Sequence, residues 1–166
     1  MQDYSDATLY QLTQQLAHLL QQSHLRLVTA ESCTGGWIAK YCTDLPGSSS
    51  WFEGGIVSYS NAIKQNQLTV SSSTLQKHGA VSEATAREMV AGARRLFNAD
   101  VALAVSGIAG PDGGSAEKPV GTVCFAWADS QNTLSKTVVF DGDREAIRRQ
   151  AVFMALQGLI QNILSP

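Results

Sequence analysis

The sequence predicts an α/β fold, a three-layer α/β/α sandwich around a mixed, mostly parallel sheet of about five strands. Along most of the chain, segments of strand length alternate with segments of helical periodicity, which is typical of strands joined by helical crossovers. Residues 101–105 form an uninterrupted apolar run, as expected for a central strand covered on both faces. Only residues 129–132 separate two further strand-like segments, 120–128 and 133–140, which favours an antiparallel hairpin and makes the sheet mixed.

The N-terminal half is expected to alternate between helices and strands. Leucines recur at helical spacing behind Ser5 and Asp6, and either of these residues can cap the helix. Gly54 and Gly55 interrupt a β-branched and aromatic stretch that is still predicted to be a strand. After the first helix, the expected order is strand, helix, strand and helix, over residues 25–29, 37–42, 51–59 and 61–68.

The C-terminal half continues this alternation. Residues 73–78 are expected to form a short helix that ends at Gly79, because glycine readily adopts the left-handed conformation of a helix C-cap. Ser82 is expected to cap a longer helix whose apolar stripe reaches Phe97. The central strand and the hairpin follow, and Asp143 caps a last helix with apolar residues at helical spacing.

Length and composition indicate a single domain, residues 1–166, that is 44% hydrophobic and only 16% charged. The light charge favours a homodimer or higher homo-oligomer. A net charge of −2 provides no broad field for nucleic acid or an anionic membrane. The N-terminus lacks the features of a leader, and no apolar run approaches the roughly 18 residues of a membrane span, so a cytoplasmic protein is expected. The three cysteines are interpreted as reduced thiols.

Two turns rich in small residues, 30–36 and 106–114, each follow a predicted strand. Ligands of open α/β sheets bind beyond the carboxyl ends of strands, so these turns are expected to border one pocket. Free backbone N–H groups in either turn suit an anion. Simple capping of the next helix and a tight loop without a ligand remain open alternatives. The glycines of the second turn are not spaced as in a dinucleotide-binding motif.

If the chain is a hydrolase, its base must be something other than a zinc site or the histidine of a Ser-His-Asp triad. Three scattered histidines support neither a zinc site nor a Ser-His-Asp triad. Lys64 can act as a base only if burial or positive neighbours lower its pKa, and the residues alone favour a solvated surface position for it. Arg144, Arg148 and Arg149 gather near the start of the last helix, where guanidinium groups suit a phosphate or form ordinary salt bridges.

A set of short motifs resembles the C-terminal domain family of the competence/damage-inducible protein CinA. Each motif is weakly specific, but their fixed order through nearly the whole chain is highly specific. The motifs are AESCTGG at residues 30–36, PGSS at 46–49, GGIVSYSN at 54–61 with Lys64, GAVS at 79–82, SGIAGPDGG at 106–114, KPVGTV at 118–123 and GDR at 142–144.

The resemblance implies a mixed-sheet α/β/α sandwich and deamidation of nicotinamide mononucleotide to nicotinic acid mononucleotide and ammonia, as a stand-alone enzyme without metal or cofactor. It also implies a serine-lysine dyad and an acyl-enzyme, carried over to Ser49 and Lys64 with Tyr59 nearby; Ser32 is the reserve nucleophile. Arg144 or Arg148 is expected to hold the phosphate. The complete set of expected substrate-binding residues is Glu31, Thr34, Gly35, Ser48, Asn61, Ser106, Gly107, Gly110, Arg144 and Arg148.

The proposed dyad poses a geometric problem. An extended strand over residues 51–59 would span about 30 Å at roughly 3.3 Å per residue. Ser49 and Lys64 can then meet only if Gly54 and Gly55 bend the strand, if Lys64 folds back, or if a second subunit completes the dyad. The sequence leaves these possibilities open, together with two other functions: a nucleotide-binding regulatory module without chemistry, and a hydrolase of another small amide or a pyrophosphate.

Overall fold

The computed structural model describes residues 2–164; residues 1, 165 and 166 of the expected single domain lie outside the described residues. Its sheet has five strands in the order β2-β1-β3-β4-β5. The β2-β1 and β1-β3 pairs are parallel, and the β3-β4 and β4-β5 pairs are antiparallel, so four strands share one direction. The expected mixed, mostly parallel sheet is confirmed. The strands are β1 (Leu27–Glu31), β2 (Phe52–Val57), β3 (Val101–Gly107), β4 (Thr122–Ala128) and β5 (Thr133–Val139).

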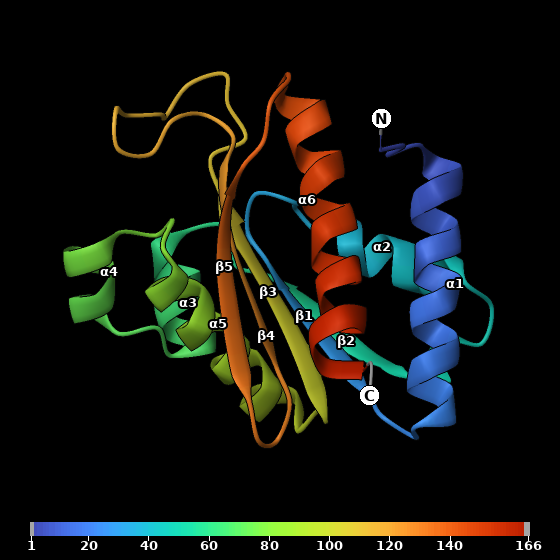
Figure 1. Ribbon diagram of the computed structural model, residues 1–166. Coiled ribbons are helices and arrows are strands. Elements are labelled where there is room, and N and C mark those ends of the chain that lie inside the picture. The colour runs from blue at the N-terminus through green and yellow to red at the C-terminus, as the bar shows by residue number, and fades with distance from the viewer. Residues whose placement is uncertain (1, 165–166) are drawn as a thin grey trace.

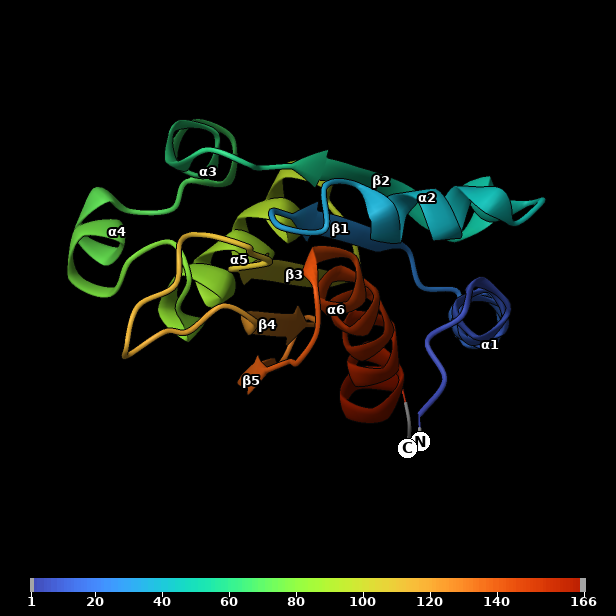
Figure 2. The same ribbon diagram turned by 90° about the horizontal axis from the view of Figure 1, so that it is seen from above.

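Helices cover both faces of the sheet and complete the predicted three layers (Figures 1 and 2). One face carries α1, α2 and α6, and α3, α4 and α5 lie on the other side. A short 3₁₀ turn precedes β2 and a π-helical turn follows α6. The helices are α1 (Asp6–Gln22), α2 (Trp37–Asp44), α3 (Asn61–Leu68), α4 (Ser72–His78), α5 (Glu83–Phe97) and α6 (Arg144–Leu159), with the turns at Ser48–Ser50 and Ile160–Leu164.

The two faces of the sheet differ in the size of their side chains. Strands β3 and β4 direct large residues such as Leu103, Phe125 and Trp127 into the core beneath α1, α2 and α6. On the opposite face the same strands present alanines, which pack against α5. Successive strand residues point to opposite faces, so this alternation gives one thick apolar layer and one shallow layer that α5 approaches closely.

Strand β1 begins two residues later than predicted. Helix α1 ends in a Schellman motif, in which the N–H of Leu25 donates to Leu20 and the N–H of His24 donates to Gln21. His24 is left-handed, with φ of 55°. Leu25 is therefore still bonded to the helix, and the chain joins the sheet at Leu27. The shift places Glu31 inside the strand and Ser32 directly after it.

The parallel strands bring distant segments to one edge of the sheet. Strands β1, β2 and β3 end side by side, with Glu31 paired to Val57 of β2 and to Val105 of β3. The turns that follow these three strands therefore meet at the carboxyl edge, as the sequence predicts. Within residues 2–164, no helix is long and apolar enough to span a bilayer.

Candidate active site

Glu31 terminates β1 and caps the helix that follows. Its carboxylate accepts N–H groups from Gly36 and Ile38 at 3.1 Å and from Ala39 at 2.8 Å. These donors are the unpaired amides of the first turn of α2, where a negative charge is also favoured by the helix dipole. Only 1% of Glu31 is exposed. The carboxylate expected to orient substrate is occupied by α2 instead, and its work is to fix the turn that carries Ser32.

Lys64 meets Ser32 across the carboxyl edge of the sheet. The Nζ atom lies 3.0 Å from Ser32 Oγ, 2.7 Å from the Ser58 carbonyl oxygen and 3.4 Å from that of Tyr59. The chain turns after β2 into α3, which Ser60 caps by accepting the Ile63 N–H. Lys64 follows one turn later and is 1% exposed. The solvated position that the residues alone favoured for Lys64 is therefore wrong.

Burial shifts the pKa values of Lys64 and of its neighbour Cys33. Removal from water lowers the pKa of Lys64 from its ordinary value of 10.5, and within residues 2–164 no carboxylate forms an ion pair with it. Burial also raises the pKa of the neighbouring Cys33 thiol to about 12. A thiol with that pKa stays protonated and is a poor nucleophile, whereas an uncharged lysine can accept a proton from Ser32.

Ser49 lies at the other end of β2. It belongs to the 3₁₀ turn before the strand, and its carbonyl faces the Arg26 guanidinium. The pairing of β2 with β1 shifts register between Phe52 and Gly54, but Gly54 and Gly55 stay paired with Val28 and Thr29 and do not bend the chain back. A Cβ on Gly55 would lie 2.5 Å from Thr29 Oγ1, so at that position glycine allows close packing between neighbouring strands. The expected contact between Ser49 and Lys64 is not formed within the chain, and Ser48 is equally remote.

The serine and lysine border a cavity of about 230 Å³ at the carboxyl edge. It unites six of the residues expected from sequence, from the turns after β1 and β2, from α3, from the end of β3 and from α6. Sequence reasoning missed the remaining four, because small apolar residues and a protonated cysteine carry no chemical signal of their own. The expected residues are Ser32, Tyr59, Lys64, Ser106, Gly107 and Arg144, and the additional ones are Cys33, Ala80, Val81 and Ala109.

Hydrogen bonds tie the cavity walls together. Arg144 donates to the Gly110 carbonyl at 2.7 Å and to the Tyr59 hydroxyl at 3.3 Å, linking α6 to the loops after β3 and β2. Ser106 donates its hydroxyl to the Ala80 carbonyl at 2.7 Å, which fixes the segment between α4 and α5. Tyr59 and Arg144 are exposed and form the rim of the cavity.

The remaining expected substrate residues lie outside the lining. Gly35 and Thr34 belong to the turn after Ser32, and Asn61 begins α3 at the surface. Thr34 is fully buried, and its Oγ1 has no hydrogen-bond partner in the described part of the chain. Among residues 2–164, Arg148 pairs with no carboxylate and does not line the cavity; it donates to the carbonyls of Cys33 and Thr34 at 3.0 Å each.

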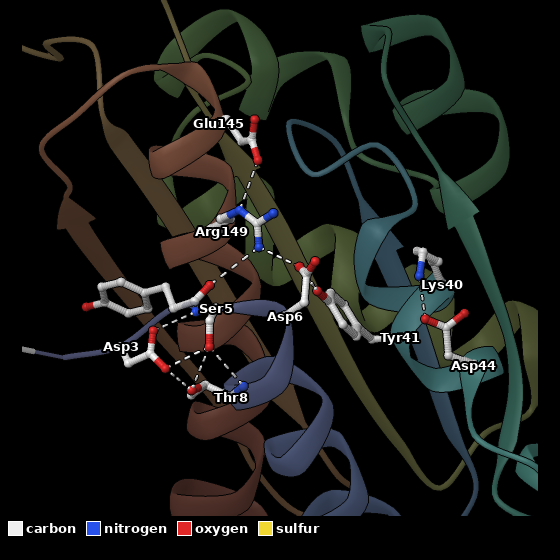
Figure 3. A network of polar contacts seen from close by, with 10 residues as sticks. Asp3, Ser5, Asp6, Thr8, Lys40, Tyr41, Asp44, Glu145 and Arg149 are labelled. Atoms are coloured by element: carbon white, nitrogen blue, oxygen red, sulfur yellow. Dashed lines mark hydrogen bonds and ion pairs between the residues drawn. The ribbon is translucent and has the colours of Figure 1, made fainter.

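Arg149 belongs to a separate network that joins α1, α2 and α6 (Figure 3). Its guanidinium pairs with Asp6 at 2.6 Å and with Glu145 at 3.0 Å, while Asp6 also accepts the Tyr41 hydroxyl at 2.8 Å. Of the two roles expected for the arginines, phosphate binding or ordinary salt bridges, Arg149 therefore has the second, with Asp6 and Glu145 as its partners. Within residues 2–164, no three metal-binding side chains gather into a possible metal site.

A comparison with protein-family models places the chain in a known group. The model of the CinA C-terminal domain matches residues 9–163. The chain belongs to the CinA C-terminal domain family. Among its relatives, the nicotinamide-nucleotide amidohydrolase PncC of Escherichia coli K12 is 51% identical over 161 residues, which cover 96% of this chain and 98% of the relative. The protein of the same name from Pseudomonas putida is 52% identical over 150 residues, covering 90% and 94% of the two chains.

Solved structures of CinA proteins share the fold. The crystal structure of competence damage-inducible protein A from Klebsiella pneumoniae superposes with a TM-score of 0.90 at 41% identity, covering 93% of this chain and 96% of that chain. The competence/damage-inducible protein from Agrobacterium tumefaciens also gives a TM-score of 0.90 at 41% identity, with coverages of 96% and 98%. These superpositions agree with the fold predicted from sequence.

Proposed function

We propose that this member of the CinA C-terminal domain family is an amidohydrolase that converts nicotinamide mononucleotide to nicotinic acid mononucleotide and ammonia, in recycling of pyridine nucleotides. The observation that carries the chemistry is the buried amine of Lys64, 3.0 Å from the hydroxyl of Ser32 in a cavity. The names of relatives about half identical in sequence support the substrate. We assign the nucleophile to Ser32 and not to Ser49.

Uncharged Lys64 matches its surroundings group for group. Its amine has two N–H donors, and two carbonyl oxygens, those of Ser58 and Tyr59, lie within reach. Lys64 Nζ lies 3.0 Å from Ser32 Oγ, and in the uncharged form the remaining lone pair can accept the Ser32 hydroxyl proton across this contact. A protonated amine would offer its third hydrogen to the serine oxygen and could not remove a proton. The contacts around Lys64 therefore support its role as the general base.

The reaction proceeds in two halves. In the first, Lys64 takes the Ser32 hydroxyl proton as Oγ attacks the carboxamide carbon, and the carbonyl electron pair moves onto oxygen. The intermediate collapses as Lys64 returns the proton to the nitrogen; the carbon–nitrogen bond breaks and ammonia leaves. In the second half, water loses a proton to Lys64 and attacks the acyl carbon, and the same proton restores the Ser32 hydroxyl.

The cavity has a wall suited to a pyridine ring and a rim suited to a phosphate. Ala80, Val81 and Ala109 provide a small apolar surface beside the dyad. Arg144 lies at the rim next to Tyr59, so a ring held beside Ser32 leaves its ribose phosphate directed toward a guanidinium. Arg144 is thus our candidate for the phosphate contact. One domain over residues 1–166, a homo-oligomeric assembly and a cytoplasmic location stay predictions.

Ammonia release from nicotinamide mononucleotide, nicotinamide and glutamine tests the function. We expect release from the mononucleotide far above the other two amides. Ser32→Ala should lower kcat by about 10³-fold or more, as loss of a nucleophile does. Ser49→Ala, the matched serine at the far end of β2, should stay within about threefold of wild type, since loss of an exposed hydroxyl far from the reacting atoms leaves the barrier unchanged. Tight binding of the mononucleotide without ammonia would instead favour the regulatory module, and a loss confined to Ser49→Ala would return the dyad to Ser49.

A further inference from the structure

Ser32 has a second serine beside it at the carboxyl edge of the sheet. Strands β1 and β3 stay in parallel register up to Glu31 and Val105, and the Ser32 N–H donates to the Val105 carbonyl at 2.9 Å. The next residues along the two strands are Ser32 and Ser106, and both line the cavity. Neighbouring strands lie about 4.8 Å apart, so Ser106 is about one strand spacing from the proposed nucleophile.

The side chains of the two serines lie on the same face of the sheet. Ala30 of β1 and Ala104 of β3 belong to the apolar cluster that packs against α5, and a residue two positions further along a strand points to the same face. The contacts agree with this direction, because Ser32 meets Lys64 of α3 and Ser106 meets the segment between α4 and α5. Two hydroxyl groups therefore lie side by side on the face from which Lys64 also reaches the cavity.

The hydroxyl of Ser106 has a fixed direction. It donates its hydrogen to the Ala80 carbonyl oxygen at 2.7 Å, and a carbonyl has no hydrogen to give in return. Within residues 2–164, no other hydrogen bond reaches this hydroxyl oxygen. A hydroxyl whose hydrogen is already committed can only accept. Ser106 therefore brings an acceptor to the cavity and no donor.

A carboxamide fits between the two serines. Its nitrogen carries two hydrogens, whereas the carboxylate formed by hydrolysis has only acceptors when ionised. A carboxamide carbon about 3 Å from Ser32 Oγ, as attack requires, can place its nitrogen about 3 Å from Ser106 Oγ and donate an N–H to it. A carboxylate in the same place would set a negatively charged oxygen against the lone pairs of Ser106.

We propose that Ser106 is a specificity-determining residue, which accepts an N–H of the substrate carboxamide and disfavours the carboxylate of the product. This inference rests on the proposed amidohydrolase function and deepens it, because it names the group that distinguishes substrate from product. Once oxygen replaces the nitrogen, an attractive contact becomes a repulsive one. Discrimination thus combines a favourable contact with the substrate and an unfavourable one with the product.

Thr85 supplies a matched control. Its hydroxyl donates to the Gly79 carbonyl at 2.7 Å, the same distance as in the contact between Ser106 and Ala80, so both hydroxyls anchor the segment between α4 and α5. Thr85 is fully buried and does not line the cavity. Thr85→Val and Ser106→Ala each remove one anchor, and only Ser106→Ala removes an acceptor from the cavity.

Equilibrium binding measures the discrimination. In a Ser32→Ala variant, which lacks the proposed nucleophile, titration calorimetry gives the dissociation constants of nicotinamide mononucleotide and nicotinic acid mononucleotide without turnover. Adding Ser106→Ala should weaken binding of the amide about 10- to 100-fold, because an N–H loses its acceptor, and should leave binding of the acid unchanged or tighter. Adding Thr85→Val instead should keep the ratio of the two constants within about threefold.

Equal weakening of both nucleotides by Ser106→Ala would show that the hydroxyl only holds the cavity wall and would overturn the proposal. Ammonia release by the protein with Ser32 intact keeps this result apart from the proposed function. If ammonia is released while the two affinities fall equally, the amidohydrolase stands and the role of Ser106 falls. If the mononucleotide releases no ammonia, the proposed substrate falls and the role of Ser106 falls with it.

Discussion

Burial disfavours the charged form of the Lys64 amine, which lies among two carbonyl oxygens and one hydroxyl. Taking the ammonium form out of water is unfavourable, and within residues 2–164 no carboxylate compensates for it. Burial of this residue therefore reduces stability, and in the proposed mechanism it lowers the pKa of the general base. The same burial keeps Cys33 protonated, which is consistent with our proposal of Ser32 as the nucleophile of this cavity.

The lowered pKa of Lys64 predicts how activity depends on pH. The uncharged amine is the reactive form, so kcat/KM should rise with pH and reach its plateau below 10.5, the ordinary pKa of lysine. Rate measurements from about pH 6 to 10 locate the inflection. An inflection at 10.5 or above would show that burial does not activate the lysine.

Stability should depend on pH through the same group. The unfolded chain keeps the Lys64 pKa near 10.5, and the folded chain has a lower one. Between these two values the unfolded state binds more protons, so the contribution of Lys64 to the free energy of unfolding rises with pH across this window. Lys64→Met should be more stable than wild type at neutral pH, and the difference should narrow as the pH approaches 10.5. Urea denaturation at several pH values measures it, and a constant difference would contradict it.

At the scale of elements, Glu31 lies at the junction of β1 and α2. It belongs to a motif expected to bind substrate, but its carboxylate caps the helix. Glu31 accepts three amides of the first turn of α2 and so determines where that helix begins. Because Ser32 lies between the strand and the helix, the same contacts fix the turn that carries this proposed nucleophile. The role of a carboxylate in such a motif stays ambiguous until the groups that donate hydrogen bonds to it are located.

Glu31→Gln tests this role. The amide keeps one acceptor oxygen but places an NH₂ group against backbone donors, leaving buried amides unpaired at a cost of about 1–3 kcal/mol. We expect a fall in Tm of a few degrees, about 2–4 °C per kcal/mol in a chain of this size. Glu145→Gln, which removes an exposed partner of Arg149, is the matched control and should change little. An unchanged Tm together with a raised KM would restore Glu31 to the substrate site.

At the scale of the whole molecule, the thick apolar layer depends on close contact between α6 and β4. Trp127 lies against Gly158 of α6, and its indole N–H donates to the Ala155 carbonyl at 2.8 Å. A Cβ on Gly158 would approach the six-membered ring of Trp127 to 2.1 Å. Helix α6 also carries Arg144 and Arg148. The packing of Trp127 against Gly158 therefore helps to position both arginines relative to the carboxyl edge of the sheet.

Gly158→Ala should therefore destabilise the protein by about 1–3 kcal/mol despite the better helix propensity of alanine, because the core has no room for a methyl group. Trp127→Phe removes the atoms that clash, so the double variant should lose less than the sum of the two single variants. Chemical denaturation of the four proteins gives this coupling energy. If the losses in free energy of unfolding were additive, the contact between α6 and the sheet would accommodate the added methyl group without a clash with Trp127.

Much of the fold was predictable because its signals are local. Periodicity, caps and turn residues identified the strands and helices, with ends displaced by a few residues where a tertiary contact intervenes, as at Leu25. For the site, the lysine and the meeting of turns at the carboxyl edge were predicted, but the serine partner was not. Family resemblance led to Ser49, which is closer to Lys64 in sequence than Ser32 is, and Ser32 was held only in reserve.

The sequence by itself determined the α/β class, the order of the elements and the edge at which the chemistry gathers. Only the tertiary structure decided that Lys64 meets Ser32, that Glu31 serves α2 and that Arg148 grips the turn. The reason is physical: hydrophobic period and capping act over a few residues, whereas these contacts depend on β1 lying between β2 and β3 and on α6 folding back over the turn after β1. Strand order is set by packing of the whole chain.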